Sequence, residues 1–205
     1  MVFAYYKRLN QTQKRIYRAS DKVTSVRLPE PGRFSPLVIR LEEALKQEHR
    51  GETQAACQQL MDAMSAALNI DPVSIKVLAA RPCKDWGELH GLYYPHEDGT
   101  RARITVWMRT AQQRRVVAFK SFFRTVLHEF GHHLDYTLLN LADSFHTEGF
   151  YKRESSLFHQ LAGDNKGREI KRVNAPKEQT KDDTREYEAF KDKWADMKRH
   201  LQEHK

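Results

Sequence analysis

Apolar residues recur every three to four positions in several stretches of this chain, which is the spacing of an amphipathic helix. The pattern predicts helices over residues 9–20, 35–50, 52–68, 116–141 and 151–162. The boundaries of the second and third follow from Ser35-Pro36, which can open a helix, and from Gly51, which interrupts the pattern. Most of the first 162 residues are therefore expected to be helical.

Between residues 73 and 108 the apolar period changes from helical spacing to two, which is typical of β-strands. Val73, Ile75 and Val77 alternate with polar residues, and residues 88–95 and 101–108 are the next strand candidates. Asp98-Gly99 is a hairpin signal between the last two. We therefore expect the α+β class, with a small antiparallel three-stranded sheet packed on the helix at 116–141.

The last 43 positions differ from the rest in composition. Residues 163–183 contain almost no large apolar side chains and are predicted to be a polar linker. Residues 184–205 are predicted to be a charged amphipathic helix, a helical tail with an apolar stripe. The expected organisation is a basic N-terminal segment (1–34), a domain (35–162), the linker (163–183) and the tail helix (184–205).

The chain is basic, with a formal net charge of +8, and the charge is uneven. Residues 1–50 hold 11 Lys and Arg against 5 Asp and Glu, whereas residues 128–162 hold 2 against 5. A basic N-terminal surface suits contact with a polyanion, for which nucleic acid is the candidate partner. The alternative is a solvated basic surface without a partner.

Cysteine content and hydropathy restrict the class of protein. Cys57 and Cys83 are too few for a disulfide framework or a four-cysteine zinc ribbon. No apolar run reaches the length of a membrane span, and the first residues lack a signal-peptide pattern. We therefore expect a cytoplasmic protein without membrane contact.

Residues 128–132 read His-Glu-Phe-Gly-His, an HExxH pattern inside the predicted helix at 116–141. Positions i and i+4 lie on one helical face, so His128 and His132 can bind one Zn²⁺ together. Glu129 stands beside them and can take a proton from zinc-bound water, which is the general-base role in a zinc hydrolase. One zinc ion per chain is expected.

A hydrolytic zinc site needs a third protein ligand and an open position. The metzincin pattern would place a histidine six residues after the second ligand, where this chain has Leu138, so that class is excluded. The remaining candidates are Asp135, His146, Glu148 and Glu154. Asp135 lies on the same helical face and is also suited to orient a ligand imidazole.

Residues 146–150, His-Thr-Glu-Gly-Phe, resemble the His-x-x-x-Phe element of SprT-like zincins. In that family the third zinc ligand stands just before a helix, and the aromatic residue packs into the core. The resemblance covers about residues 37–162 and implies a minimal zincin fold. It also implies that His128, His132 and His146 bind zinc and that Glu129 is the base. SprT-like proteins often carry a C-terminal zinc ribbon, for which this chain lacks the cysteines.

These features together predict a zinc-dependent metallopeptidase that hydrolyses protein or peptide substrates through a Glu-activated, zinc-bound water. Tyr136 and Tyr151 are candidate oxyanion donors. An extended substrate is expected to pair with a sheet edge near Gly91 or residues 101–108. The alternative is a nucleic-acid-associated binding protein whose zinc is structural or vestigial, with the basic N-terminal residues carrying the function.

Overall fold

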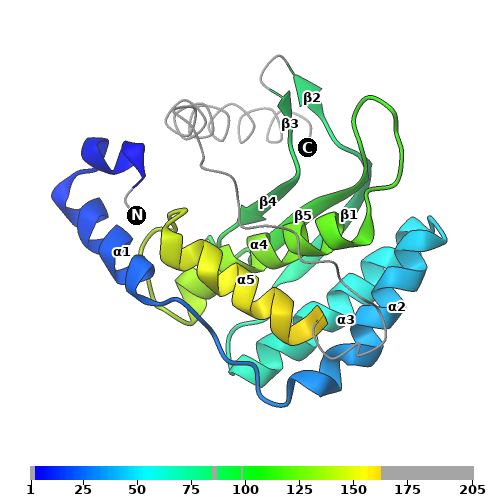
Figure 1. Ribbon diagram of the computed structural model, residues 1–205, viewed down its shortest axis with the longest axis horizontal. Helices are drawn as coiled ribbons and strands as arrows, with labels where there is room; N and C mark the ends of the chain where they lie inside the picture. Colours follow the sequence, from blue (N-terminus) through cyan, green and yellow to red (C-terminus); the bar gives the residue numbers. More distant parts are fainter. Residues whose placement is uncertain (1–2, 85–86, 98, 163–205) are drawn as a thin grey trace.

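A computed structural model describes residues 3–84, 87–97 and 99–162, which form helices and a small sheet (Figure 1). The helices are α1 (Gln11–Lys22), α2 (Ser35–Lys46), α3 (Arg50–Leu68), α4 (Phe119–Thr137) and α5 (Glu148–Ala162), with the 3-10 helices η1 (Ala4–Arg8) and η2 (Pro31–Phe34). The strands are β1 (Ser74–Ala80), β2 (Cys83–Lys84), β3 (Gly87–Glu88), β4 (Gly91–Tyr94) and β5 (Arg103–Arg109). The α+β class is confirmed. The predicted linker and tail helix lie outside the described residues, and the division into domains stays a prediction.

The three-stranded sheet has the order β1-β5-β4 and is mixed. β4 pairs with β5 in the antiparallel sense, but β1 pairs with β5 in the parallel sense, with Val77 opposite Val106. The expectation of a wholly antiparallel sheet was therefore wrong. Alternating apolar residues indicate a strand without indicating its partner, and the intervening β2–β3 ladder and β4 bring β5 back beside β1 in the same direction.

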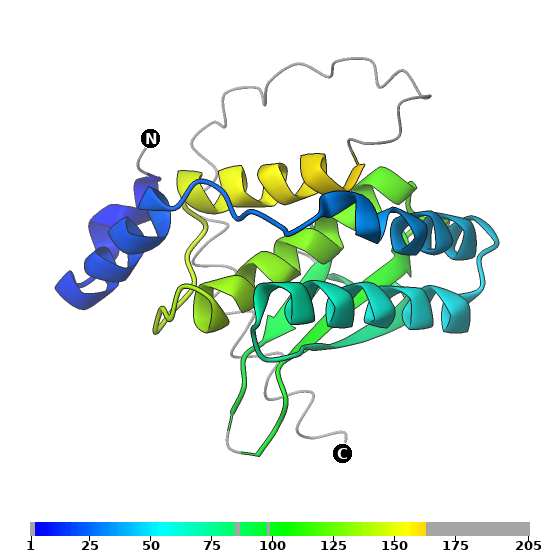
Figure 2. The same cartoon turned by 90° about the horizontal axis from the view of Figure 1, so that it is seen from below.

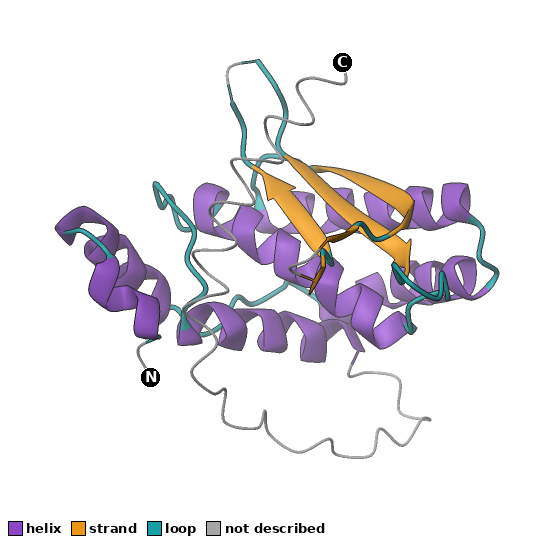
Figure 3. Ribbon diagram, turned by 90° about the horizontal axis from the view of Figure 1, so that it is seen from above, coloured by secondary structure: helices purple, strands orange, loops and turns teal. Residues whose placement is uncertain are grey.

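The helices lie on one face of the sheet (Figure 3), where α3 contacts β1 and α4 contacts β4 and β5. The apolar side of α4 is the centre of this layer. Its fully buried side chains are Phe122, Phe123, Val126, Leu127, Phe130 and Leu134. On its other side α4 contacts α5, so α4 is enclosed between the sheet and a second helix.

The chain before α2 runs along the outside of α5 (Figure 2), and both α1 and η2 contact this helix. Asn10 caps α1 through a capping box with Gln13, which confirms a helix close to the predicted 9–20. The stretch after α1 runs along α5, because Gln160 binds the backbone of Leu28 at 2.9 Å and of Val26 at 2.8 Å. None of the described helices combines the length and the apolar character needed to cross a membrane.

Candidate metal centre

Three imidazoles meet where α4 lies beside the loop that precedes α5. His128 and His132 stand one turn apart on α4, and His146 comes from the loop. The Nε2 atom of His146 lies 2.9 Å from Nε2 of His128 and 3.1 Å from Nε2 of His132. Three nitrogens bound tetrahedrally to one zinc ion would lie about 3.3 Å apart. The cluster therefore has the donor type and spacing to hold one metal ion.

The outer nitrogens of two of these rings have fixed partners. Nδ1 of His128 lies 3.1 Å from Oε2 of Glu154, and Nδ1 of His132 lies 2.7 Å from Oγ of Ser144. The Ser144 hydroxyl in turn donates to Asp135 at 2.6 Å. Since an ionised carboxylate only accepts, and the Ser144 hydrogen is already donated, both Nδ1 atoms carry the imidazole hydrogen. The Nε2 lone pairs are left facing the centre, as metal binding requires.

The protonation of the three histidines also fits a metal ion, which needs neutral imidazoles. Burial lowers the pKa of His146 to about 3, with help from His128. Burial and the neighbouring His146 and His128 hold the pKa of His132 well below its usual value. Burial alone would lower the pKa of His128, but its hydrogen bond to Glu154 and the charges of Glu129 and Glu154 raise it. Protons therefore compete with a metal mainly at His128.

The Phe150 ring forms the floor under the cluster. Its centroid lies 5.0 Å from that of His128, 4.8 Å from that of His132 and 5.3 Å from that of His146. The ring is buried and lies close against α4 at Gly131, where an added Cβ would make a tight 3.0 Å contact with Cζ of Phe150. The resemblance to the His-x-x-x-Phe element implied that Phe150 packs into the core, and this packing is confirmed.

Glu129 is 7% exposed and lies between α4 and the edge strand β4. Burial raises its pKa to about 7, although the charge of His128 acts in the opposite direction. A Cβ at Gly91 would lie 2.4 Å from Oε1 of Glu129, so the backbone of β4 passes directly against this carboxylate. The glutamate is held in one place, with a proton affinity suited to exchange near neutral pH.

The other candidate ligands stand around the cluster rather than in it. Glu154 binds the outer nitrogen of His128 and pairs with Arg124 at 3.2 Å. Asp135 is fully buried and acts on His132 through Ser144. Glu148 pairs with Lys152 at 2.7 Å in the first turn of α5. The structure thus brings His146, and none of these three carboxylates, to the inner nitrogens of His128 and His132.

The two candidate oxyanion donors lie at different depths. Tyr151 is 38% exposed and stacks on His146, with ring centroids 5.8 Å apart. Tyr136 stacks on Tyr93, which itself stacks on His132, and burial raises the pKa of Tyr136 to about 12. Tyr151 is therefore in direct ring contact with the cluster, and Tyr136 is one ring further away.

His133 neighbours the second motif histidine but faces away from the cluster. It is fully buried, with Nε2 2.7 Å from the carbonyl oxygen of Asp71 and Nδ1 3.1 Å from the hydroxyl of Tyr93. The carbonyl only accepts, so Nε2 donates to it and Nδ1 accepts from the tyrosine. Both ring nitrogens are used within the core, and His133 is a packing residue.

Comparison of this chain with protein-family models, with curated proteins and with solved structures gave no match in any of the three. The fold and the site themselves show an α+β protein with a three-histidine cluster able to hold a metal ion. The likeness to SprT-like zincins rests on the HExxH and His-x-x-x-Phe motifs alone.

Proposed function

We propose that this protein is a zinc-dependent metallopeptidase. The observation that carries the proposal is the convergence of three imidazole Nε2 atoms beside a buried glutamate on the same helix. Three neutral histidines favour zinc among the common cellular divalent ions, and three protein ligands leave a coordination position open. When bound, zinc would polarise the substrate carbonyl and lower the pKa of a water molecule.

In this proposal Glu129 moves the protons of the reaction. Its carboxylate takes a proton from the attacking water, whose oxygen forms the new bond to the carbonyl carbon. The same carboxyl group then gives that proton to the amide nitrogen as the C–N bond breaks. A pKa of about 7 supports both halves of this cycle, because the group can gain and lose a proton near neutral pH.

The edge strand β4 is the proposed binding site for the substrate backbone. β4 pairs with β5 on one side only, because it is the last strand in the order β1-β5-β4. An extended peptide can add to such an edge through main-chain hydrogen bonds. Gly91 brings this edge against Glu129, so a paired peptide would lie beside the base. β5, the other strand proposed for this role, is central and paired on both sides.

The test compares Glu129→Gln with the unsubstituted chain on an unfolded protein such as casein. We expect cleavage to fall by a factor of about 10³ or more while one zinc per chain stays bound, because glutamine fills the same space without accepting a proton. Glu43→Gln is the matched control, since Glu43 lies exposed on α2. Full cleavage by Glu129→Gln would exclude the peptidase mechanism.

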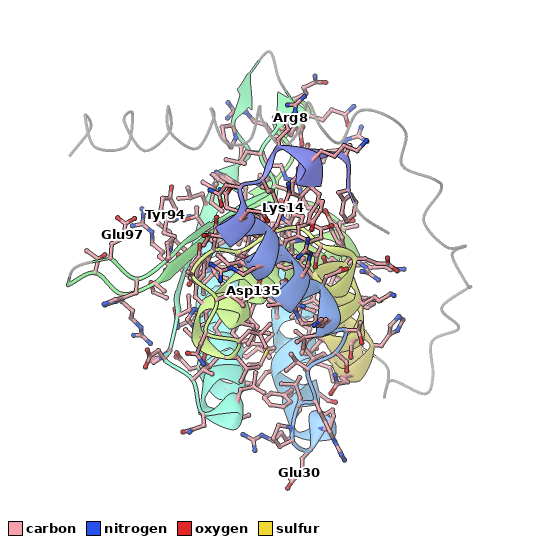
Figure 4. The ribbon with its side chains drawn as sticks, turned by 90° about the vertical axis from the view of Figure 1, so that its left-hand side faces the viewer. Arg8, Lys14, Glu30, Tyr94, Glu97 and Asp135 are labelled. Atoms are coloured by element: carbon pink, nitrogen blue, oxygen red, sulfur yellow. The ribbon has the colours of Figure 1, made fainter. Side chains whose placement is uncertain are left out.

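A second candidate function is nucleic-acid binding, with a zinc that is structural or vestigial. It is favoured by the exposed basic side chains of η1 and α1, among them Lys7, Arg8, Arg15 and Arg18. Figure 4 labels Arg8 on η1 and Lys14 on α1. This function predicts duplex DNA or RNA binding that weakens steeply with salt and is unchanged by a chelator. Binding that is absent at low salt, or removed by Glu129→Gln, would exclude it.

A further inference from the structure

The first described residues of the chain pack on the loop that carries His146 and on the start of α5. We call residues 3–22, which include η1 and α1, the N-terminal segment. Its buried Tyr5, Leu9 and Tyr17 form a small apolar cluster with Phe145, the residue before His146. This cluster is separate from the main core. The segment therefore makes its own apolar contacts with the loop of the metal centre.

One hydrogen bond joins the segment to the third histidine. The hydroxyl of Tyr5 donates to the backbone carbonyl of His146 at 2.8 Å. Tyr5 is only 3% exposed, and its ring lies 5.9 Å from that of Tyr17 on α1. Next to it, the ring of Phe3 contacts Tyr151, which stacks on His146. The backbone position of His146 is thus set partly from the N-terminal side.

A second route leads from the end of α1 to His132 through the guanidinium of Arg153. This group donates to the carbonyl of Ser20 at 2.6 Å and to its hydroxyl at 2.9 Å. It also pairs with Asp135 at 2.6 Å, and Asp135 accepts from the Ser144 hydroxyl that binds His132. The last carbonyls of a helix are a natural partner for a cation.

Burial makes this second route rigid. Arg153 and Asp135 are each no more than 1% exposed. The backbone N–H of Gly149, at the start of α5, also donates to Asp21 of α1 at 2.9 Å. A buried charge pair that lost its surrounding acceptors would be strongly destabilised. The end of α1 therefore has one preferred position relative to Asp135.

We infer that the N-terminal segment is a positioning element of the metal centre, so that its docking and metal binding strengthen each other. The segment is connected to His146 through Tyr5 and to His132 through Ser20, and these two chains of hydrogen bonds have no residue in common. Coupling of this kind is reciprocal: a docked segment tightens metal binding, and a bound metal tightens docking to the same extent. The inference rests on the metal-binding part of the proposed function and does not require peptidase activity.

The direct test measures zinc affinity of the full chain by competition with a chromophoric chelator. Tyr5→Phe removes only the hydroxyl that binds His146, and we expect the zinc Kd to rise about fivefold. Tyr6→Phe is the matched control: it removes a hydroxyl of the same segment that binds Arg18 on the surface, and its Kd should be unchanged. Ser20→Ala, which weakens the second route, should raise the Kd in the same way.

The reciprocal test follows hydrogen exchange of the α1 amides in the unsubstituted protein, where zinc should slow exchange at least fivefold, because docking of the whole segment includes the Tyr5 contact. Equal zinc affinity in Tyr5→Phe, Ser20→Ala and the unsubstituted chain, with exchange in α1 indifferent to zinc, would overturn the inference and leave the proposed function intact. Failure of the unsubstituted chain to bind zinc would overturn both.

Discussion

Gly131, within α4, and Gly91, on the neighbouring strand β4, each allow a close contact beside the HExxH motif. At Gly131 the neighbour is Phe150, which supports all three imidazoles, and at Gly91 it is the carboxylate of Glu129. A methyl group at Gly91 would overlap the carboxylate, and one at Gly131 would crowd the Phe150 ring. The chemistry at residue scale therefore depends on two missing side chains as well as on those present.

Gly91→Ala should separate catalysis from metal binding. The added Cβ would meet Oε1 of Glu129 at 2.4 Å and Cγ2 of Thr125 at 2.8 Å, so the carboxylate must move. We expect kcat/KM on an unfolded protein to fall about a hundredfold, with zinc still bound. In Gly51→Ala the new methyl has only a 3.5 Å contact to His49, and activity should be unchanged. A fully active Gly91→Ala would show that Glu129 is not held by this contact.

The pH dependence of metal binding should report His128 alone. Its pKa is raised above the usual 6.5, whereas burial lowers the pKa values of His132 and His146, so near neutral pH His128 is the one ligand imidazole with a proton to lose. As pH falls below the pKa of His128, zinc affinity should drop about tenfold per pH unit, and above it the affinity should be constant. Chelator competition between pH 5 and 8 measures the slope. A slope of two or three would contradict this assignment.

At the scale of elements, the sequence predicted where the helices lie but not which strands pair. The apolar period located the main helices, because each buries one stripe of its own residues. It could not place β5 between β1 and β4, since pairing depends on contacts far apart in the chain. The candidate site could likewise be predicted only in part. Helical spacing brings His128 and His132 together, so both could be found from the sequence. Ser144 lies in a loop without a periodic pattern, and only the structure shows that it binds His132.

The start of α5 is an element whose stability can be tested separately. Oγ1 of the buried Thr147 accepts from the N–H of Phe150 at 2.9 Å and caps the helix one residue after His146. Thr147→Ala should lower the free energy of unfolding by about 1 kcal/mol, and Thr147→Ser should retain most of it. Urea unfolding is the measurement, with the exposed Thr24→Ala as control. Equal stability of the alanine and serine variants would show that the hydroxyl does not act as a cap.

For the whole molecule, the metal centre lies at the junction of three parts of the chain. α4 supplies two histidines, the loop before α5 supplies the third, and the N-terminal segment packs on that loop. The N-terminal segment also contacts α5, where Arg153 binds Ser20 and Gly149 binds Asp21. A metal ion at the junction would therefore stabilise the assembly of the three parts, in addition to its proposed part in catalysis.

Zinc should accordingly raise the thermal stability of the whole protein. With free zinc a thousandfold above its Kd, the gain is about 4 kcal/mol, or roughly 10 °C in Tm for a chain of this size. Calorimetry with zinc and with a chelator measures the shift. His146→Ala should lose most of it, because the third ligand is absent. A Tm that does not respond to zinc would contradict a folded-state metal site.

The contact between Tyr5 and His146 spans 141 positions, and that between Arg153 and Ser20 spans 133. A ribosome adding about 5–20 residues per second needs roughly 7–30 s to make the intervening chain. Throughout that time the first aromatic residues have no loop to pack on. When the HExxH turn emerges, its two histidines still lack the third. A metal ion could therefore be held by all three histidines only after residue 146 has been made.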